Sequence, residues 1–118
     1  MYLKCTVDGQ LDGLVRLLWP NGDLMRDYEN VYEWVWLKLP EHNLRLNFSR
    51  EHEWGEESRI YPIYVSAFSL ESDEFVDEIP GEIIDIFLQG LKCKIEVYSG
   101  RANVDEEDGI PTRILNSL

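Results

Sequence analysis

Two histidines are the first candidates for metal or acid–base chemistry in this chain of 118 residues. His52 stands between Glu51 and Glu53, and imidazole and carboxylate groups are common ligands of zinc. Neighbouring residues of an extended chain point in opposite directions, so this triplet is poorly arranged to hold one ion. His42 falls in an expected turn, and no pair of histidines has a metal-binding spacing. We therefore predict no metal site and no cofactor.

Nucleophilic chemistry has few candidates either. The two cysteines, Cys5 and Cys93, each stand in an alternating, strand-like pattern and are expected to be packed thiols. A single bridge between these two strands is the alternative. The sequence contains no Cys-x-x-Cys, Gly-x-Ser-x-Gly, Gly-x-Gly-x-x-Gly or P-loop pattern. We therefore predict no catalytic residue and expect a protein that is not an enzyme.

The acidic side chains are the most prominent chemical feature. The chain has 23 acidic and 11 basic side chains, which gives a formal charge of −12. Residues 51–85 hold eleven acids and one base, Arg59, and so carry −10, while residues 105–108 add −4. This charge argues against direct binding of nucleic acid or of an anionic membrane. The acidic segments are either solvated loops or a surface that meets a cationic partner.

A cationic protein is the partner that such a surface fits best. An acidic patch speeds the encounter with a basic surface, and basic surfaces are typical of proteins that bind phosphate, nucleases included. Trp54 stands among the charged residues 51–57 and is a candidate aromatic anchor for an interface. The predicted partner-binding residues are Glu51, Glu53, Trp54, Glu56, Glu57, Tyr64, Glu71, Asp73, Glu74, Asp77 and Glu78.

In size, charge and aromatic content, the chain resembles the small acidic immunity proteins that bacteria make against nuclease toxins. The acidic clusters at residues 51–57 and 73–85 carry this resemblance, with Trp54 and Tyr64 beside them. The resemblance implies a non-catalytic, cytoplasmic inhibitor that covers the active site of a toxin. We expect it to be a monomer or a weak dimer.

Two other functions are compatible with the sequence. The first is a nucleic-acid mimic that blocks a DNA-binding defence protein, which requires the acids to form a long stripe with phosphate-like spacing. The second is a small ligand-binding or enzymatic barrel, with a pocket lined by Tyr32, Trp34 and Trp36.

Short strands must position most of these residues. Leu3, Cys5 and Val7 alternate with polar residues and predict a first strand. The apolar run at 14–19 is followed by a turn signal at 20–23, and we expect it to pair with a returning strand at 24–26.

A second hairpin has the clearest pattern. Strands at 31–39 and 44–50 flank a turn, and pairing Leu39 with Leu44 aligns apolar side chains on one face. The same register sets Glu33 opposite Arg50. Further strands are expected at 60–69, 92–99 and 110–115.

The hydrophobic period changes near residue 80. Apolar residues then recur every three or four positions, which predicts a helix over 80–89 that ends near Gly90. Together these elements predict an α+β fold in one domain, 1–118, with a curved antiparallel sheet and one packed helix. A small barrel or half-barrel is the alternative. No apolar span of about 20 residues and no signal-peptide pattern is present.

Overall fold

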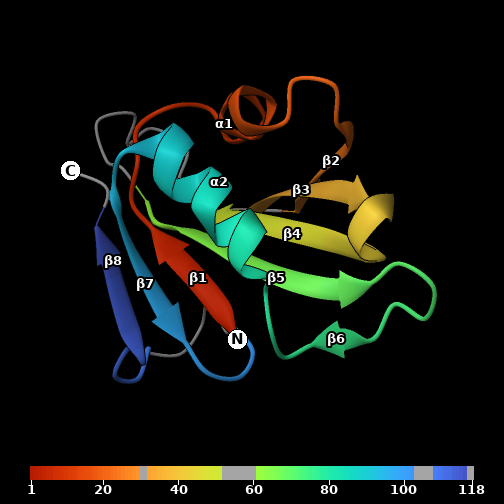
Figure 1. Ribbon diagram of the computed structural model, residues 1–118. Helices are drawn as coiled ribbons and strands as arrows, with labels where there is room; N and C mark the ends of the chain where they lie inside the picture. Colours follow the sequence, from red (N-terminus) through yellow and green to blue (C-terminus); the bar gives the residue numbers. More distant parts are fainter. Residues whose placement is uncertain (30–31, 52–60, 103–107, 117–118) are drawn as a thin grey trace.

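The structure is an open antiparallel sheet covered on one face by two helices (Figure 1). The computed structural model describes residues 1–29, 32–51, 61–102 and 108–116. The strands are β1 (Tyr2–Cys5), β2 (Asp23–Glu29), β3 (Tyr32–Leu39), β4 (Leu44–Glu51), β5 (Ile63–Ser69), β6 (Phe75–Val76), β7 (Lys94–Tyr98) and β8 (Arg113–Asn116). The helices are α1 (Leu11–Leu18), α2 (Gly81–Leu91) and a short 3-10 turn, η1 (Pro40–His42). The predicted α+β class and antiparallel sheet are confirmed, and the sheet does not close into a barrel.

The order of the strands places the beginning of the chain in the interior of the sheet. The sequence of neighbours is β2-β3-β4-β5-β1-β7-β8, so β1 lies between β5 and β7. Strand β6 pairs with the end of β5, beyond the residues of β5 that β1 contacts. Long-range pairing therefore holds the two halves of the chain together.

The predicted hairpin at 31–39 and 44–50 is confirmed with its register. Leu39 lies opposite Leu44, and Glu33 lies opposite Arg50, as expected for strands β3 and β4. Every second side chain of a strand points toward the helices, because successive residues of a strand face opposite sides of the sheet. The buried core is formed by Leu3, Cys5, Leu11, Val15, Val35, Leu37, Leu39, Leu44, Leu46, Phe48, Ile63, Val65, Ala67, Ile79, Ile83, Ile84, Phe87, Leu91, Ile95 and Val97.

The expected hairpin at 14–19 and 24–26 is wrong. The first segment belongs to α1, which buries Leu11 and Val15, and β2 pairs with β3 instead. Leu11, Val15 and Leu18 are four and three residues apart, which is a helical spacing. The turn after this segment is real, because the Gly22 amide donates to the Trp19 carbonyl over 3.0 Å.

The predicted helix at 80–89 is confirmed as α2, with different ends. It runs to Leu91 and ends at Lys92, whose φ of 47° is left-handed. Gly90 lies inside the helix, where an added Cβ would collide with Leu18 of α1. Its role is therefore close packing between the two helices rather than termination of α2.

The remaining strands lie close to their expected positions. The pattern at 60–69 corresponds to β5, and Pro62 directly precedes that strand. The patterns at 92–99 and 110–115 correspond to β7 and β8. No described helix has the length and hydropathy needed to cross a membrane.

Candidate functional site

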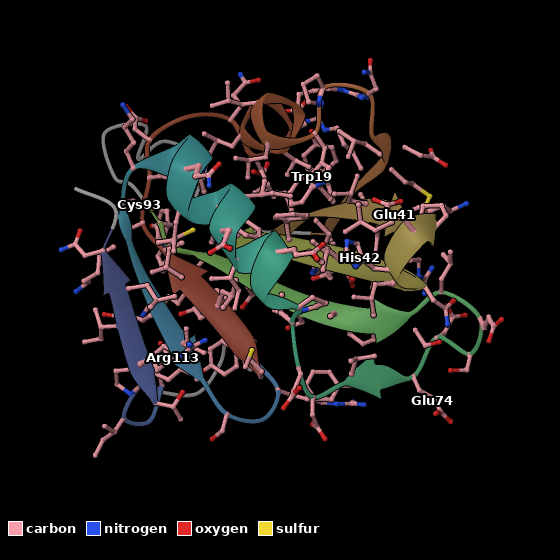
Figure 2. The ribbon with its side chains drawn as sticks, in the orientation of Figure 1. Trp19, Glu41, His42, Glu74, Cys93 and Arg113 are labelled. Atoms are coloured by element: carbon pink, nitrogen blue, oxygen red, sulfur yellow. The ribbon has the colours of Figure 1, made fainter. Side chains whose placement is uncertain are left out.

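Three segments meet at the end of the sheet where β3 turns into β4. They are η1, the turn at 70–74 between β5 and β6, and the first turn of α2. The Leu70 amide donates to the Asn43 carbonyl over 3.0 Å, and Nε2 of His42 lies 3.9 Å from a carboxylate oxygen of Glu82. Figure 2 shows Glu41 and His42 on η1, with Glu74 on the neighbouring turn. These contacts bring acidic residues from distant parts of the sequence to one region.

We call this region the acidic surface. It consists of Glu41, Glu71, Asp73, Glu74 and Glu82 from these three segments, together with Asp77 and Glu78 between β6 and α2, and all seven are exposed. Asp73 pairs with Arg45, and Asp77 lies near the Met1 amino group. Four other members, Glu41, Glu71, Glu74 and Glu78, form no ion pair with a described residue. These seven carboxylates outnumber the cations beside them, which are Arg45, the Met1 amino group and Arg101, whose guanidinium lies over the Phe75 ring next to Glu74.

The backbone of the β5–β6 turn fixes the position of its acids. The Ser69 amide donates to the Glu74 carbonyl over 2.7 Å, and the Asp73 amide donates to the Ser69 carbonyl over 3.0 Å. Asp73 has a φ of 59°, a left-handed conformation that aspartate tolerates better than most residues. Arg45, the ion partner of Asp73, also stacks over the Trp36 ring at 4.8 Å. This turn is therefore ordered by its own hydrogen bonds.

A groove of about 510 Å³ adjoins the acidic surface at Glu41. It lies between η1 and the turn that follows α1, and Leu18, Trp19 and Leu39 form part of its apolar lining. The Trp19 ring meets Phe87 edge-on at 5.7 Å between ring centroids, so it is held by the core. Its polar lining consists of Asn21, of Asp23 and Lys38, which pair with each other over 3.9 Å, and of Glu41. Apolar walls beside the Glu41 carboxylate suit a side chain that has an aliphatic stem and a cationic head.

The predicted residues at 51–57 are not part of the acidic surface as far as the structure describes them. Glu51 is the last residue of β4 and pairs with Tyr32, whereas the acidic surface adjoins the first residue of β4, Leu44. Seven residue steps of a strand span about 23 Å. The predictions at Glu53, Trp54, Glu56 and Glu57 lie outside the described residues.

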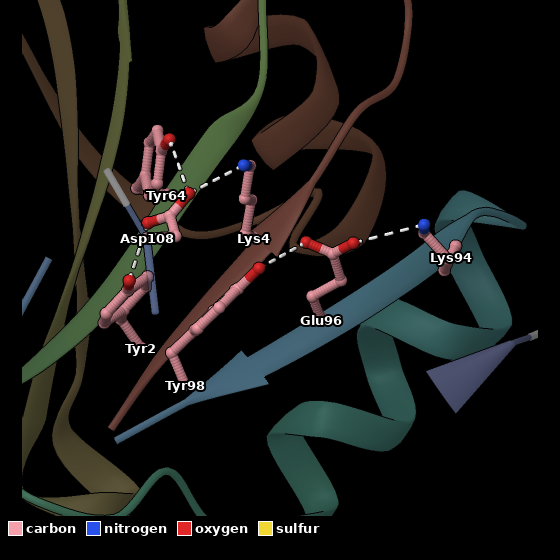
Figure 3. Close-up of polar contacts among 7 residues, drawn as sticks. All are labelled: Tyr2, Lys4, Tyr64, Lys94, Glu96, Tyr98 and Asp108. Atoms are coloured by element: carbon pink, nitrogen blue, oxygen red, sulfur yellow. Dashed lines mark hydrogen bonds and ion pairs between the residues drawn. The ribbon is translucent and has the colours of Figure 1, made fainter. Parts of the chain in front are cut away.

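Tyr64 lies in a different polar cluster, on the sheet face opposite the helices (Figure 3). Its hydroxyl donates to Asp108 over 3.3 Å. Tyr2 and Lys4 donate to the same carboxylate over 2.6 and 2.7 Å. The Asp108 side chain is only 12% exposed. We call these four residues the Asp108 cluster; it ties the chain near residue 108 to strands β1 and β5.

The pKa values in this region show what the cluster can do. Burial raises the pKa of Asp108, but hydrogen bonds from Lys4 and Tyr2 outweigh it and hold the pKa below its usual range. Hydrogen bonding to Asp108 raises the pKa of Lys4. Burial and a hydrogen bond to Glu96 raise the pKa of the adjacent Tyr98 to about 12. A general acid or base works best with a pKa near the working pH, and each of these shifts moves away from neutrality.

The sequence prediction counted Asp108 as part of an acidic run and missed this cluster. Its carboxylate is held by Tyr2, Lys4 and Tyr64 and is not available to a partner. The outward positions of these three residues on their strands follow from the alternation of the pattern. Their meeting depends on pairing between β1 and β5, which local patterns do not predict.

Within the described part of the chain, no three His, Cys, Asp or Glu side chains are grouped to hold a metal ion. Comparison of the chain with protein-family models, curated proteins and solved structures found no significant match. The function is therefore inferred from the charge and the geometry of this chain alone.

Proposed function

We propose that this protein is a non-catalytic inhibitor that binds and neutralises a basic partner protein, a nuclease toxin, through the acidic surface. The observation that carries the proposal is the gathering of exposed carboxylates from η1, the β5–β6 turn, the segment between β6 and α2, and α2 itself. Four of these carboxylates have no ion partner among the described residues. Like charges held close together repel one another and disfavour the folded state. A cationic partner would relieve this repulsion on binding.

The chemistry of a nuclease cleft matches this surface. Such a cleft presents Lys and Arg to the phosphates of its substrate, and carboxylates can take the places of those phosphates. Charge complementarity mainly increases the association rate and the specificity, while buried apolar contacts supply much of the affinity. The groove beside Glu41 offers such a contact, because a Lys or Arg stem can lie along Trp19 with its head near the carboxylates.

The two alternative functions have less support. The acidic surface comes from several short segments at one end of the sheet rather than from a row along one element, which favours a protein partner over nucleic-acid mimicry. An open sheet has no barrel interior in which a ligand could be enclosed. One of the residues expected to line that pocket, Trp36, packs against Phe68 with ring centroids 5.5 Å apart and lies under Arg45.

Charge reversal at the β5–β6 turn tests the proposal. We expect the Glu71→Lys/Glu74→Lys variant to bind the protein encoded by the adjacent gene at least about 100-fold more weakly than the wild type, because like charges would then face each other across the interface. Isothermal titration calorimetry measures this change, and inhibition of the partner's nuclease activity should weaken in parallel. The wild-type affinity should also fall as salt is added.

A matched control makes the same change of charge elsewhere. Asp27 and Glu29 are exposed on the edge strand β2, toward the end of the sheet away from η1. The Asp27→Lys/Glu29→Lys variant should keep nearly the wild-type affinity. An equal loss in both variants, or a wild-type affinity that salt does not change, would contradict a specific role for the acidic surface.

A further inference from the structure

The fold brings the two cysteines of the chain together although they are 88 positions apart. Cys5 is the last residue of β1 and pairs with Ile95 of β7. Cys93 comes two residues before Ile95, just ahead of β7, and packs against the core cluster to which Cys5 belongs. The two thiols are close enough to share a hydrogen bond. Figure 2 shows Cys93 at the end of α2, far from Glu74 of the acidic surface.

The two thiols differ in access and in acidity. Cys5 is buried, with 3% of its surface exposed, whereas Cys93 is half-buried. The hydrogen bond from Cys5 lowers the pKa of Cys93, although burial opposes this shift. The same hydrogen bond, together with burial, raises the pKa of Cys5. Cys93 is therefore the thiol that a small oxidant can reach, and its lowered pKa favours the thiolate, the form that reacts with oxidants.

We propose that Cys5 and Cys93 form a reversible disulfide, in which Cys93 is the attacking thiol and Cys5 the resolving thiol. The partly exposed thiolate can meet a small oxidant, and its buried neighbour is already in place to react with the product. A reactive, accessible thiol next to a resolving thiol is the arrangement expected of a redox-sensitive pair. The site is independent of the acidic surface.

With hydrogen peroxide as the oxidant, the disulfide forms in two steps. The Cys93 thiolate attacks one peroxide oxygen, the O–O bond breaks, and hydroxide leaves while a sulfenic acid forms. The Cys5 sulfur then loses its proton and attacks the Cys93 sulfur, the S–O bond breaks, and water leaves as the disulfide forms. In sum, two thiols lose two hydrogens and one peroxide becomes two waters. A dithiol reductant reverses the change by thiol–disulfide exchange.

Peroxide treatment followed by alkylation tests this proposal. After treatment and unfolding in iodoacetamide, intact-mass spectrometry should find monomer with no label and a mass lower by two hydrogens. Treatment with dithiothreitol before alkylation should restore two labels. The bridge would link nearly the whole chain and should raise the melting temperature by roughly 10 °C. Two labels after peroxide, a Cys93 sulfinic acid as the main product, or dimers joined through Cys93 would overturn the proposal.

Single substitutions separate the two roles. In Cys5→Ala, Cys93 should stop at the sulfenic acid and be trapped by dimedone. Cys93→Ser changes a half-buried position. In the folded form of this variant, peroxide should leave Cys5 unmodified. Oxidation of Cys5 in that variant at the wild-type rate would show that Cys93 is not the attacking thiol. Because neither substitution touches the acidic surface, failure here leaves the proposed inhibitor function to its own test.

Discussion

Replacing Phe87 with alanine is expected to lower the free energy of unfolding by about 3–5 kcal/mol. The Phe87 side chain is 2% exposed and points from α2 to the sheet. Its ring centroid lies 5.8 Å from that of Phe48 and 5.7 Å from that of Trp19, so it joins both the sheet and the turn after α1 to α2. Truncation would leave a cavity at this junction. Chemical denaturation, followed by tryptophan fluorescence, measures the loss.

Phe75 provides the matched control for this substitution. It is half-buried outside the core, where its ring meets Phe68 at 6.0 Å and Arg101 at 4.8 Å. Phe75→Ala removes the same atoms but should cost only about 1 kcal/mol, because no closed cavity is left. Equal losses in the two variants would mean that Phe87 is not the centre of the packing between α2 and the sheet.

Replacing Asp108 with alanine is expected to cost about 2–3 kcal/mol at neutral pH. The substitution leaves the Lys4 ammonium, 26% exposed, and the Tyr2 hydroxyl without their shared acceptor. Asp85 on α2 is exposed, and Asp85→Ala should change stability by less than about 0.5 kcal/mol. Denaturant unfolding of both variants makes the comparison, and similar small effects would mean that Asp108 does not anchor its segment.

The Asp108 cluster should also make stability depend on pH. The pKa of Asp108 is lowered in the folded protein, so its contribution is present above the ordinary aspartate value, about 3.9, and is lost as the pH falls below it. The difference in stability between wild type and Asp108→Asn should therefore shrink below about pH 4. The pKa of Lys4 is raised, so its contribution persists below about pH 10 and is lost above its folded-state value. A difference that stays constant from pH 7 to pH 3 would contradict this role.

Local patterns were enough to predict the β3–β4 hairpin and α2. The hairpin alternates over eight residues on each side of a short turn, so a slip of one residue would expose its apolar face. Helix α1 is only eight residues long, and its apolar residues also fit the short apolar run of a strand. Gly13 inside this helix also has a low helix propensity. A helix of eight residues has only about two turns, which is too short for its hydrophobic pattern to be told apart from that of a strand.

The site was less predictable than the fold, because it depends on which ends of strands lie together. Residues 51–85 are one acidic segment in the sequence, but β4 and β5 run in opposite directions. Glu51 and Glu71 therefore lie at opposite ends of the sheet, and Glu41 joins Glu71 through the contact between Leu70 and Asn43. Pairing between strands that are distant in the sequence brings these residues together, and the amino-acid composition does not predict that pairing.

The interior position of β1 has a consequence for the order of events during biosynthesis. This strand is made before the other seven described strands, yet it is bordered by β5 and by β7, which are made later. Tyr2 can pair with Tyr98 only after all the residues between them have been made. Contacts of such long range slow folding and leave strand edges open in the nascent protein. Completion of the sheet must therefore wait until β7 and β8 have been made.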